Sequence, residues 1–141
     1  MTDFNRVFID SAPLIYFLEN DANFGERSKY ILNEILSKGK GLSTSVVTYE
    51  EFLVHPYQSN DAERVQSLFD FLGDCHVQIE PITLEIAQKA ARIRAKYKDI
   101  KGMDALQLAT AVIGGCDLFL TNDRQLRQYD EIKCVMLEEW R

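Results

Sequence analysis

The sequence predicts a single α/β domain in which a central, mostly parallel sheet lies between two layers of helices. Short apolar runs alternate along the chain with longer amphipathic segments, and this order is typical of strands joined by helical crossovers. The 141 residues, 46% of them hydrophobic, have the usual size of one domain. No linker-like or low-complexity stretch divides the chain. We therefore expect residues 1–141 to form one three-layer α/β/α domain with four to five strands.

The first half of the chain contains two strand-and-helix steps. Apolar runs predict strands at residues 6–9 and 42–47, and helical periodicity predicts helices at residues 12–18, 24–37 and 48–54. Pro13 fits the first turn of its helix, and Gly39 ends the second helix. Thr48 is expected to begin the third helix, and His55 with Pro56 to end it.

The second half continues the same alternation. Strands are expected at residues 77–82, 118–121 and 132–137, and helices at 61–72, 84–97 and 104–113. Thr83 is a suitable N-cap for the helix at 84–97. The segment 104–113 is apolar almost all round apart from a stripe formed by Asp104, Gln107 and Thr110, so we expect a buried helix.

The composition argues against a membrane-spanning protein, a secreted protein and a zinc site built on cysteine pairs. The apolar runs are too short to span a membrane, and the first residues lack the pattern of a signal peptide. Cys75, Cys116 and Cys134 are odd in number and widely spaced, without the CxxC pairs that bind zinc. They predict reduced, buried thiols in a cytoplasmic protein.

A net charge of −6 argues at first sight against a nucleic-acid partner. However, the segment 89–101 carries six basic residues and one acid, Asp99. Such a strip is compatible with contact to a phosphate backbone, although a charge run taken alone is more often a solvated helix face.

Four acids are the candidate functional residues: Asp10, Glu51, Asp104 and Asp123. Each has a simpler interpretation when taken alone. Asp104 could cap its helix, Glu51 could form a capping box with Thr48, and the other two acids could be turn residues. Their joint placement favours function, because two strand ends and two helix starts can meet at the carboxyl edge of one sheet.

Four carboxylates gathered at one edge would repel one another and would need cations. Sites made only of oxygen ligands select hard ions such as Mg²⁺ or Mn²⁺, which are often completed by a substrate phosphate. Ions of this kind activate water and stabilise the leaving oxygen in phosphodiester cleavage. A two-histidine mechanism is less favoured, because His55 and His76 are expected on separate elements.

Four sequence segments, taken in order, resemble motifs of the PIN-domain family (PilT N-terminus-like): VFIDSAPLIYFLE, STSVVTYEEFL, GMDALQLATA and FLTNDRQL. The resemblance covers nearly the whole chain. It places the acids of the family on Asp10, Glu51, Asp104 and Asp123, and it implies a Mg²⁺- or Mn²⁺-dependent ribonuclease with a parallel sheet.

Chains of this length within the family resemble VapC-type toxins. The resemblance therefore implies that this chain cuts RNA, is inhibited by a small antitoxin protein and forms a homodimer. In this interpretation Asp10, Asp104 and Asp123 hold a metal ion, while Glu51 holds a second ion or acts as a general base.

Further residues could support these acids. The hydroxyl groups of Ser11 and Thr121 could orient a carboxylate, and Asn122 could add a neutral ligand. Ser11 departs from the Thr found in many members. Four basic residues near the acids are candidates to bind the RNA backbone: Arg94, Lys98, Lys101 and Arg124.

Two alternatives to a ribonuclease remain open at the level of sequence. A phosphatase or a receiver domain also uses Mg²⁺ and Asp, but Ala12 stands where a DxDxT phosphatase needs a second acid, and a receiver-type lysine is missing. A non-catalytic PIN-like scaffold that binds a protein or RNA is the other alternative. Metal titration would separate the scaffold from an enzyme, because a carboxylate cluster gains stability from Mn²⁺.

Overall fold

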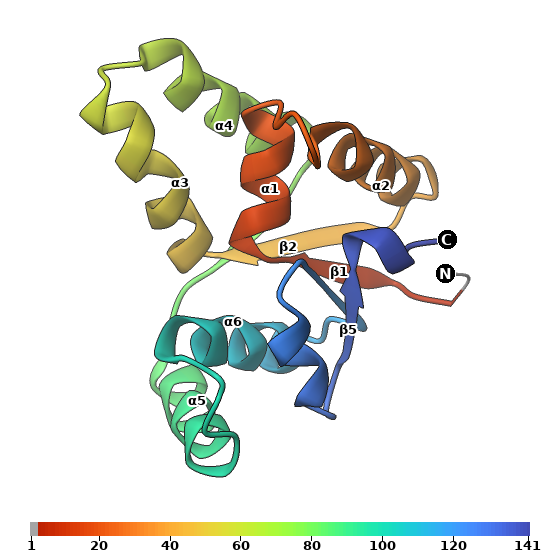
Figure 1. Cartoon of the computed structure of the whole chain (residues 1–141), viewed down its shortest axis with the longest axis vertical. Coiled ribbons are helices and arrows are strands. Elements are labelled where there is room, and N and C mark those ends of the chain that lie inside the picture. Colours follow the sequence, from red (N-terminus) through yellow and green to blue (C-terminus); the bar gives the residue numbers. More distant parts are fainter. Residues whose placement is uncertain (1–2) are drawn as a thin grey trace.

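The computed structural model describes residues 3–141 as a five-stranded sheet with helices on both faces (Figure 1). Its strands are β1 (Arg6–Ile9), β2 (Gly41–Ser45), β3 (Gln78–Glu80), β4 (Leu118–Thr121) and β5 (Lys133–Met136). Its helices are α1 (Ser11–Leu18), α2 (Gly25–Ser37), α3 (Val46–Gln58), α4 (Ala62–Asp74), α5 (Leu84–Lys96) and α6 (Gly102–Ile113). Two short 3-10 helices, η1 (Arg124–Gln128) and η2 (Leu137–Glu139), flank β5. The expected α/β/α class is confirmed, with five strands.

All strand pairs are parallel, and their order across the sheet is β3-β2-β1-β4-β5. The chain leaves β1 for β2 on one side and returns later to β4 on the other side. The order therefore reverses between β1 and β4, which is the point where ligands collect in such sheets. Because every strand is parallel, Asp10 after β1 and Asp123 after β4 follow neighbouring strand ends at one edge.

Alternation along the strands divides the core into two halves. Val7 and Ile9 of β1 belong to the core that packs under α1, α2, α3 and α4, whereas Phe8 faces α5 and α6. In the second half, the rings of Phe8 and Phe119 stack at 5.2 Å between centroids. Figure 1 shows the same division, with α5 and α6 on the opposite side of the sheet from α1 to α4.

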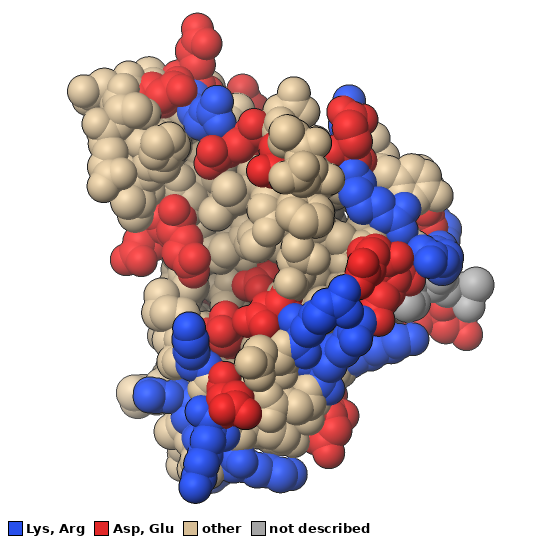
Figure 2. Space-filling model, in the orientation of Figure 1, with Lys and Arg blue, Asp and Glu red and all other residues tan. Residues whose placement is uncertain are grey.

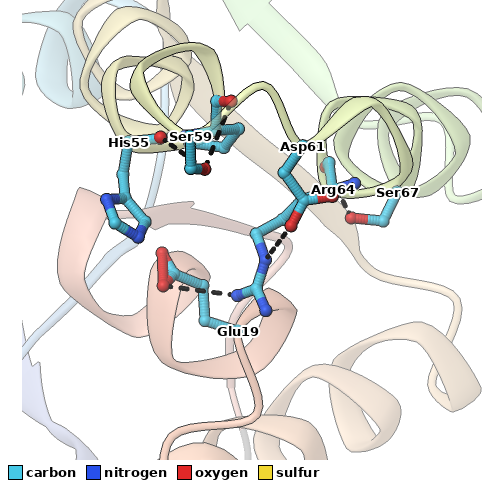
Figure 3. Close-up of polar contacts among 7 residues, drawn as sticks. Glu19, His55, Ser59, Asp61, Arg64 and Ser67 are labelled. Atoms are coloured by element: carbon cyan, nitrogen blue, oxygen red, sulfur yellow. Dashed lines mark hydrogen bonds and ion pairs between the residues drawn. The ribbon is translucent and has the colours of Figure 1, made fainter.

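An ion pair between Arg64 and Glu19 connects the helical hairpin of α3 and α4 to the end of α1. Arg64 on α4 lies 3.4 Å from a carboxylate oxygen of Glu19 at the end of α1 and 3.4 Å from one of Asp61, the N-cap of α4 (Figure 3). His55 lies on α3 in the same region, and its carbonyl oxygen accepts a hydrogen bond of 3.0 Å from Ser59 Oγ. This position is in keeping with an ordinary polar role for His55.

Two boundary expectations around α3 are wrong. The helix begins at Val46, with Ser45 as its N-cap, and not at Thr48, which lies buried inside the helix. It also continues through Pro56 to Gln58. Proline lacks a backbone donor, but the carbonyl groups around it accept hydrogen bonds from Ser59 and later residues, so the last turn is satisfied.

Smaller differences from the sequence expectations concern the last strand and the thiols. β5 ends at Met136, because Leu137 begins η2. The cysteines are free, as expected, but partly rather than fully buried. Burial raises the pKa of Cys116 to about 11 and that of Cys134 to about 12.

Within residues 3–141, no helix has the length and apolarity needed to cross a membrane.

Candidate active site

Asp10 is the most buried of the four candidate acids. It caps α1 directly after β1, and its backbone N–H donates to the carbonyl oxygen of Leu120, which extends the β1–β4 pairing by one bond of 2.9 Å. Only 8% of its surface is exposed. Burial raises the pKa of Asp10, although hydrogen bonds donated to the carboxylate oppose the rise.

Three donors hold the Asp10 carboxylate. The Ser11 backbone N–H donates to Oδ1 over 2.9 Å and Gln107 Nε2 donates to Oδ1 over 3.3 Å, while Thr121 Oγ1 donates to Oδ2 over 2.8 Å. The Thr121 hydroxyl thus contacts the Asp10 carboxylate, whereas Ser11 contacts Asp10 through its backbone N–H and directs its hydroxyl to Glu51. Asp10 is therefore held by the start of α1, the end of β4 and α6.

Asp104 lies in the first turn of α6 and is half-buried. The expectation that it could be the N-cap is wrong, because the cap position is taken by Lys101, whose side chain makes no capping bond. Burial raises the pKa of Asp104 to about 6, and the negative charges of Asp10, Asp123 and Glu51 add to that rise. Lys101 opposes it. The electrostatic coupling places all four acids in one neighbourhood.

Glu51 lies on α3, and its carboxylate is turned toward α1. Ser11 Oγ donates to Glu51 Oε1 over 3.2 Å. The capping box that Thr48 and Glu51 could form is absent, since the helix begins before Thr48. Partial burial and the charges of Asp10 and Glu50 raise the pKa of Glu51.

Asp123 follows β4 and caps η1. Its Oδ1 accepts from the backbone N–H of Gln125 over 3.0 Å, and its own backbone N–H donates to Thr121 Oγ1 over 3.1 Å. The role of a turn and capping residue is therefore real for Asp123. Capping uses only one of the two carboxylate oxygens of Asp123, so the other oxygen is available for further interactions.

A groove of about 600 Å³ opens beside two of the acids. Glu51 and Asp104 line it together with Arg94, Lys101 and apolar residues of α5 and α6. The Arg94 guanidinium lies against Gly102 at the start of α6, where a Cβ atom would meet its Nη1 at 3.6 Å. Two of the four basic candidates are thus in the groove.

The other two basic candidates lie elsewhere. Arg124 and Asn122 line a second hollow of about 430 Å³ between η1 and the start of α2. The Arg124 guanidinium forms an ion pair with Glu138 at the surface. Lys98 is exposed after α5 and does not line the groove beside Asp104.

Acidic side chains gather near the middle of the face shown in Figure 2, and basic side chains cover the end of the molecule formed by α5. The basic strip expected from the sequence therefore borders an acidic hollow. A polyanion laid along the strip could reach the acids only if their charge were reduced.

Oxygen atoms are the only donors that the four acids offer, and oxygen is the ligand that Mg²⁺ and Mn²⁺ prefer. Within residues 3–141, however, no three Asp, Glu, His or Cys side chains converge tightly enough to form a metal-binding group. The acids have the right ligand chemistry and mutual repulsion for a hard cation, without a preformed cage.

Sequence reasoning missed the polar network behind the acids. Ser45, Thr48 and Gln107 are buried, and Gln107 is hydrogen-bonded to both Ser45 and Thr48. The signal that could have revealed it is the run of hydroxyl residues from Ser43 to Thr48 in a segment that is otherwise buried. Buried polar side chains are kept only where partners satisfy them.

The model of the PIN domain family matches residues 7–132 of the chain. The chain belongs to the PIN-domain family. The match contains all four acids, and the fold described above, with its five parallel strands and six α-helices, agrees with it. The resemblance seen in the sequence is confirmed. No curated protein matches the chain in sequence.

Several solved structures share the fold at low sequence identity. A chain of the VapBC2 complex from Rickettsia felis, bound to a DNA fragment from its promoter, is 14% identical and has a TM-score of 0.76, with 93% of this chain and 98% of that chain covered. A chain of a toxin-antitoxin complex from Klebsiella pneumoniae is 20% identical, with a TM-score of 0.73 and coverage of 95% and 99%.

The toxin VapC20 from Mycobacterium tuberculosis, which is described as cleaving the Sarcin-Ricin loop, is 15% identical to this PIN domain. Its TM-score is 0.66, and the match covers 90% of this chain and 98% of that chain. The TM-scores of these three structures demonstrate a shared fold. Sequence identities this low do not by themselves demonstrate a shared activity.

Proposed function

We propose that this PIN domain is a metal-dependent endoribonuclease that hydrolyses RNA phosphodiester bonds and is the toxin of a type II toxin-antitoxin pair. The observation that supports the proposal is that Asp10 and Asp123 follow neighbouring parallel strands, β1 and β4, where the strand order reverses, while Glu51 and Asp104 line one groove. The negative charges of Asp10, Asp123 and Glu51 also contribute to the raised pKa of Asp104. Such a concentration of negative charge is costly unless a cation binds there.

Asp10, Asp104 and Asp123 would hold the first ion, Mg²⁺ or Mn²⁺, and Asn122 is available as a neutral ligand beside them. When bound, the ion supplies positive charge that activates water and stabilises the leaving oxygen. Glu51 would accept the proton of the attacking water or help to hold a second ion. Burial raises the pKa of Glu51, which makes its carboxylate a stronger proton acceptor.

The basic residues would bind and steer the RNA. Arg94 and Lys101 share the groove with Glu51 and Asp104, so a backbone lying there would place a phosphate next to the acids. Arg124 and Lys98 would make weaker contacts at the periphery. The bond is cleaved by direct attack of water, so a covalent intermediate with the protein is not required.

The partners proposed are a small antitoxin protein and a second copy of this chain. The comparison structures include complexes of toxins with antitoxins, which supports the first partner. Co-purification with the product of an adjacent short reading frame tests the antitoxin, and light scattering of the purified chain tests the homodimer. We place the reaction in the cytoplasm, where its RNA substrate would be.

The test of the activity is cleavage of a labelled single-stranded RNA in Mn²⁺ and in EDTA. The wild-type protein is expected to cut only with Mn²⁺. Asp10→Asn and Asp104→Asn should each abolish cleavage while leaving the circular dichroism spectrum unchanged. Asp74→Asn, at the far end of α4, removes one charge as a matched control and should cut normally. Undiminished cleavage by both site variants would refute the proposed mechanism.

Thermal unfolding separates the enzyme from a non-catalytic scaffold. An enzyme of this kind should gain several degrees in Tm from millimolar Mn²⁺, because binding stabilises the folded state and relieves repulsion. No gain in the wild-type protein would favour the scaffold.

A further inference from the structure

Gln107 is a buried polar residue at the centre of the sheet edge. It lies one turn beyond Asp104 on α6, and 1% of its surface is exposed. Its Oε1 accepts a hydrogen bond from Ser45 Oγ. Its Nε2 donates to Thr48 Oγ1 over 2.7 Å and to Asp10 Oδ1 over 3.3 Å. One side chain thus joins α6 to the end of β1, the end of β2 and the start of α3.

The direction of the Gln107 amide follows from its neighbours. Ser45 Oγ accepts from the backbone N–H of Val47 over 3.0 Å, which leaves its hydrogen free to donate to Gln107 Oε1. An amide turned the other way would point its oxygen at the Asp10 carboxylate, and two acceptors would then face each other. The amide nitrogen therefore faces Asp10.

A second branch of the network leads from Gln107 to Glu51. Ser11 Oγ uses its only hydrogen to donate to Glu51 Oε1, so it must accept from Thr48 Oγ1 at 3.1 Å. Thr48 in turn accepts from Gln107 Nε2. Every hydrogen in this branch points toward the carboxylate, and aligned hydrogen bonds strengthen one another in a buried setting.

We propose that Gln107 is a positioning residue for the ribonuclease reaction, which orients the Asp10 and Glu51 carboxylates through two branches of one hydrogen-bond network. The proposal rests on the proposed function for the reaction itself. Because Gln107 shares α6 with Asp104, it also ties the placement of three acids to one helix. Partners of this kind orient metal-binding groups, and their loss typically reduces metal affinity or activity about 10- to 100-fold.

The test compares Gln107→Met with Thr110→Val. Met keeps the length of the side chain and removes the donor and the acceptor. Thr110 is buried on the same stripe of α6, but its hydroxyl donates only to the carbonyl oxygen of Leu106. Its replacement disturbs the helix equally without touching the network. Circular dichroism and thermal unfolding in EDTA establish that both variants fold.

Two readouts are measured, the Kd for Mn²⁺ by calorimetry without RNA, and kcat and KM for a single-stranded RNA. Gln107→Met is expected to raise the Kd for Mn²⁺ and to lower kcat, each by about 10- to 100-fold, with KM little changed. Thr110→Val should stay within about twofold of wild type in all three quantities. A Gln107→Met protein that matches wild type, or a Thr110→Val protein that loses as much, would overturn the proposal.

Thr48→Val provides a second route if Gln107→Met does not fold. It removes the Thr48 step of the branch to Glu51 and leaves the bond from Gln107 to Asp10 and a longer bond of 3.4 Å from Gln107 Nε2 to Ser11 Oγ, so we expect kcat to fall by about tenfold at most. An unchanged kcat in this variant would overturn the role of Thr48 in the Glu51 branch. A wild-type protein that binds Mn²⁺ but cuts no RNA refutes the proposed function, and the ratio of Mn²⁺ affinities still decides the role of Gln107. A protein that does neither refutes both.

Discussion

Individual carboxylates at the site lie in surroundings that oppose their negative charge. Burial is the largest cause of the raised pKa of Asp10, Glu51 and Asp104, and neighbouring acids add to it. Hydrogen bonds from Thr121, Ser11 and Gln107 offset part of the cost for Asp10. At the scale of the residue, these carboxylates therefore destabilise the folded protein when they are ionised.

Asp104→Asn should stabilise the metal-free protein at neutral pH. The pKa of Asp104 rises from 3.8 to about 6 on folding, so the folded protein holds this proton at pH values where the unfolded chain has released it. Stability is therefore lost as pH rises from about 4 to above 6, and Asn removes that loss.

Urea unfolding in EDTA at pH 5 and pH 8 measures this effect. Asp104→Asn is expected to gain about 1–2 kcal/mol at pH 8 after allowance for solvent screening, and about half as much at pH 5, because pH 5 lies between the two pKa values of Asp104. A variant that is less stable than wild type at pH 8 would contradict the raised pKa of Asp104.

Arg94→Gln should weaken RNA binding without affecting the fold. Arg94 lines the groove beside Asp104, whereas Arg92 on the same helix lines a different hollow near Tyr97 and serves as the matched control. Loss of one phosphate contact should raise KM and flatten the plot of log Kd against log salt by about 0.7–1. Equal effects of Arg92→Gln would show that the basic face acts only as diffuse charge.

At the scale of the element, the start of α3 connects the sheet to the site. Ser45 ends β2 and caps α3, with its side-chain oxygen accepting from Val47 N and its hydrogen donated to Gln107. Replacing it therefore affects two elements at once. Thr83 caps α5 in the same way, accepting from Ile86 N over 3.2 Å.

Ser45→Ala should cost more stability than Thr83→Ala. Loss of a cap alone costs about 1 kcal/mol, and this is the expected loss for Thr83→Ala. Ser45→Ala also leaves the buried Gln107 oxygen without its donor, which adds about 1–3 kcal/mol. Urea unfolding of both variants measures the difference, and equal losses would contradict the proposed connection.

At the scale of the whole molecule, one sheet connects both halves of the core. The same strands contribute to both halves, because their side chains point alternately to the two faces of the sheet. The single tryptophan, Trp140, is buried near the C-terminus, and its ring meets that of Phe4 edge-on at 5.4 Å. The two ends of the chain therefore pack together in one half of the core.

The chain should accordingly unfold as one cooperative unit. Trp140 fluorescence reports the half of the core that contains α2 and η2, whereas far-UV circular dichroism reports all helices. Both signals are expected to give the same urea midpoint, as in two-state unfolding of a single domain. Separate midpoints would indicate that α5 and α6 unfold independently and that residues 1–141 are not one folding unit.

Local sequence patterns accounted for the fold class and for the residue types at the site. Short strands, amphipathic helices and caps such as Thr83 are determined largely by neighbours in the chain, and their order implied a parallel sheet. A parallel order also placed Asp10 and Asp123 at one edge on the condition that their strands are neighbours, and the structure shows that β1 and β4 are neighbours. These expectations agree with the structure because each depends on local periodicity and on general rules of chain connection.

Only the tertiary structure decided where α3 begins and ends, what Asp104 and Glu51 do locally, and which side chains support the acids. Thr48 and Glu51 match a capping box by spacing, but Ser45 takes the cap because it ends β2 and meets Gln107 across the sheet edge. Gln107 is 97 positions from Asp10, and no local pattern indicates such a contact. Burial, desolvation and hydrogen bonds between distant segments are set by packing, so they become visible only when the chain is folded.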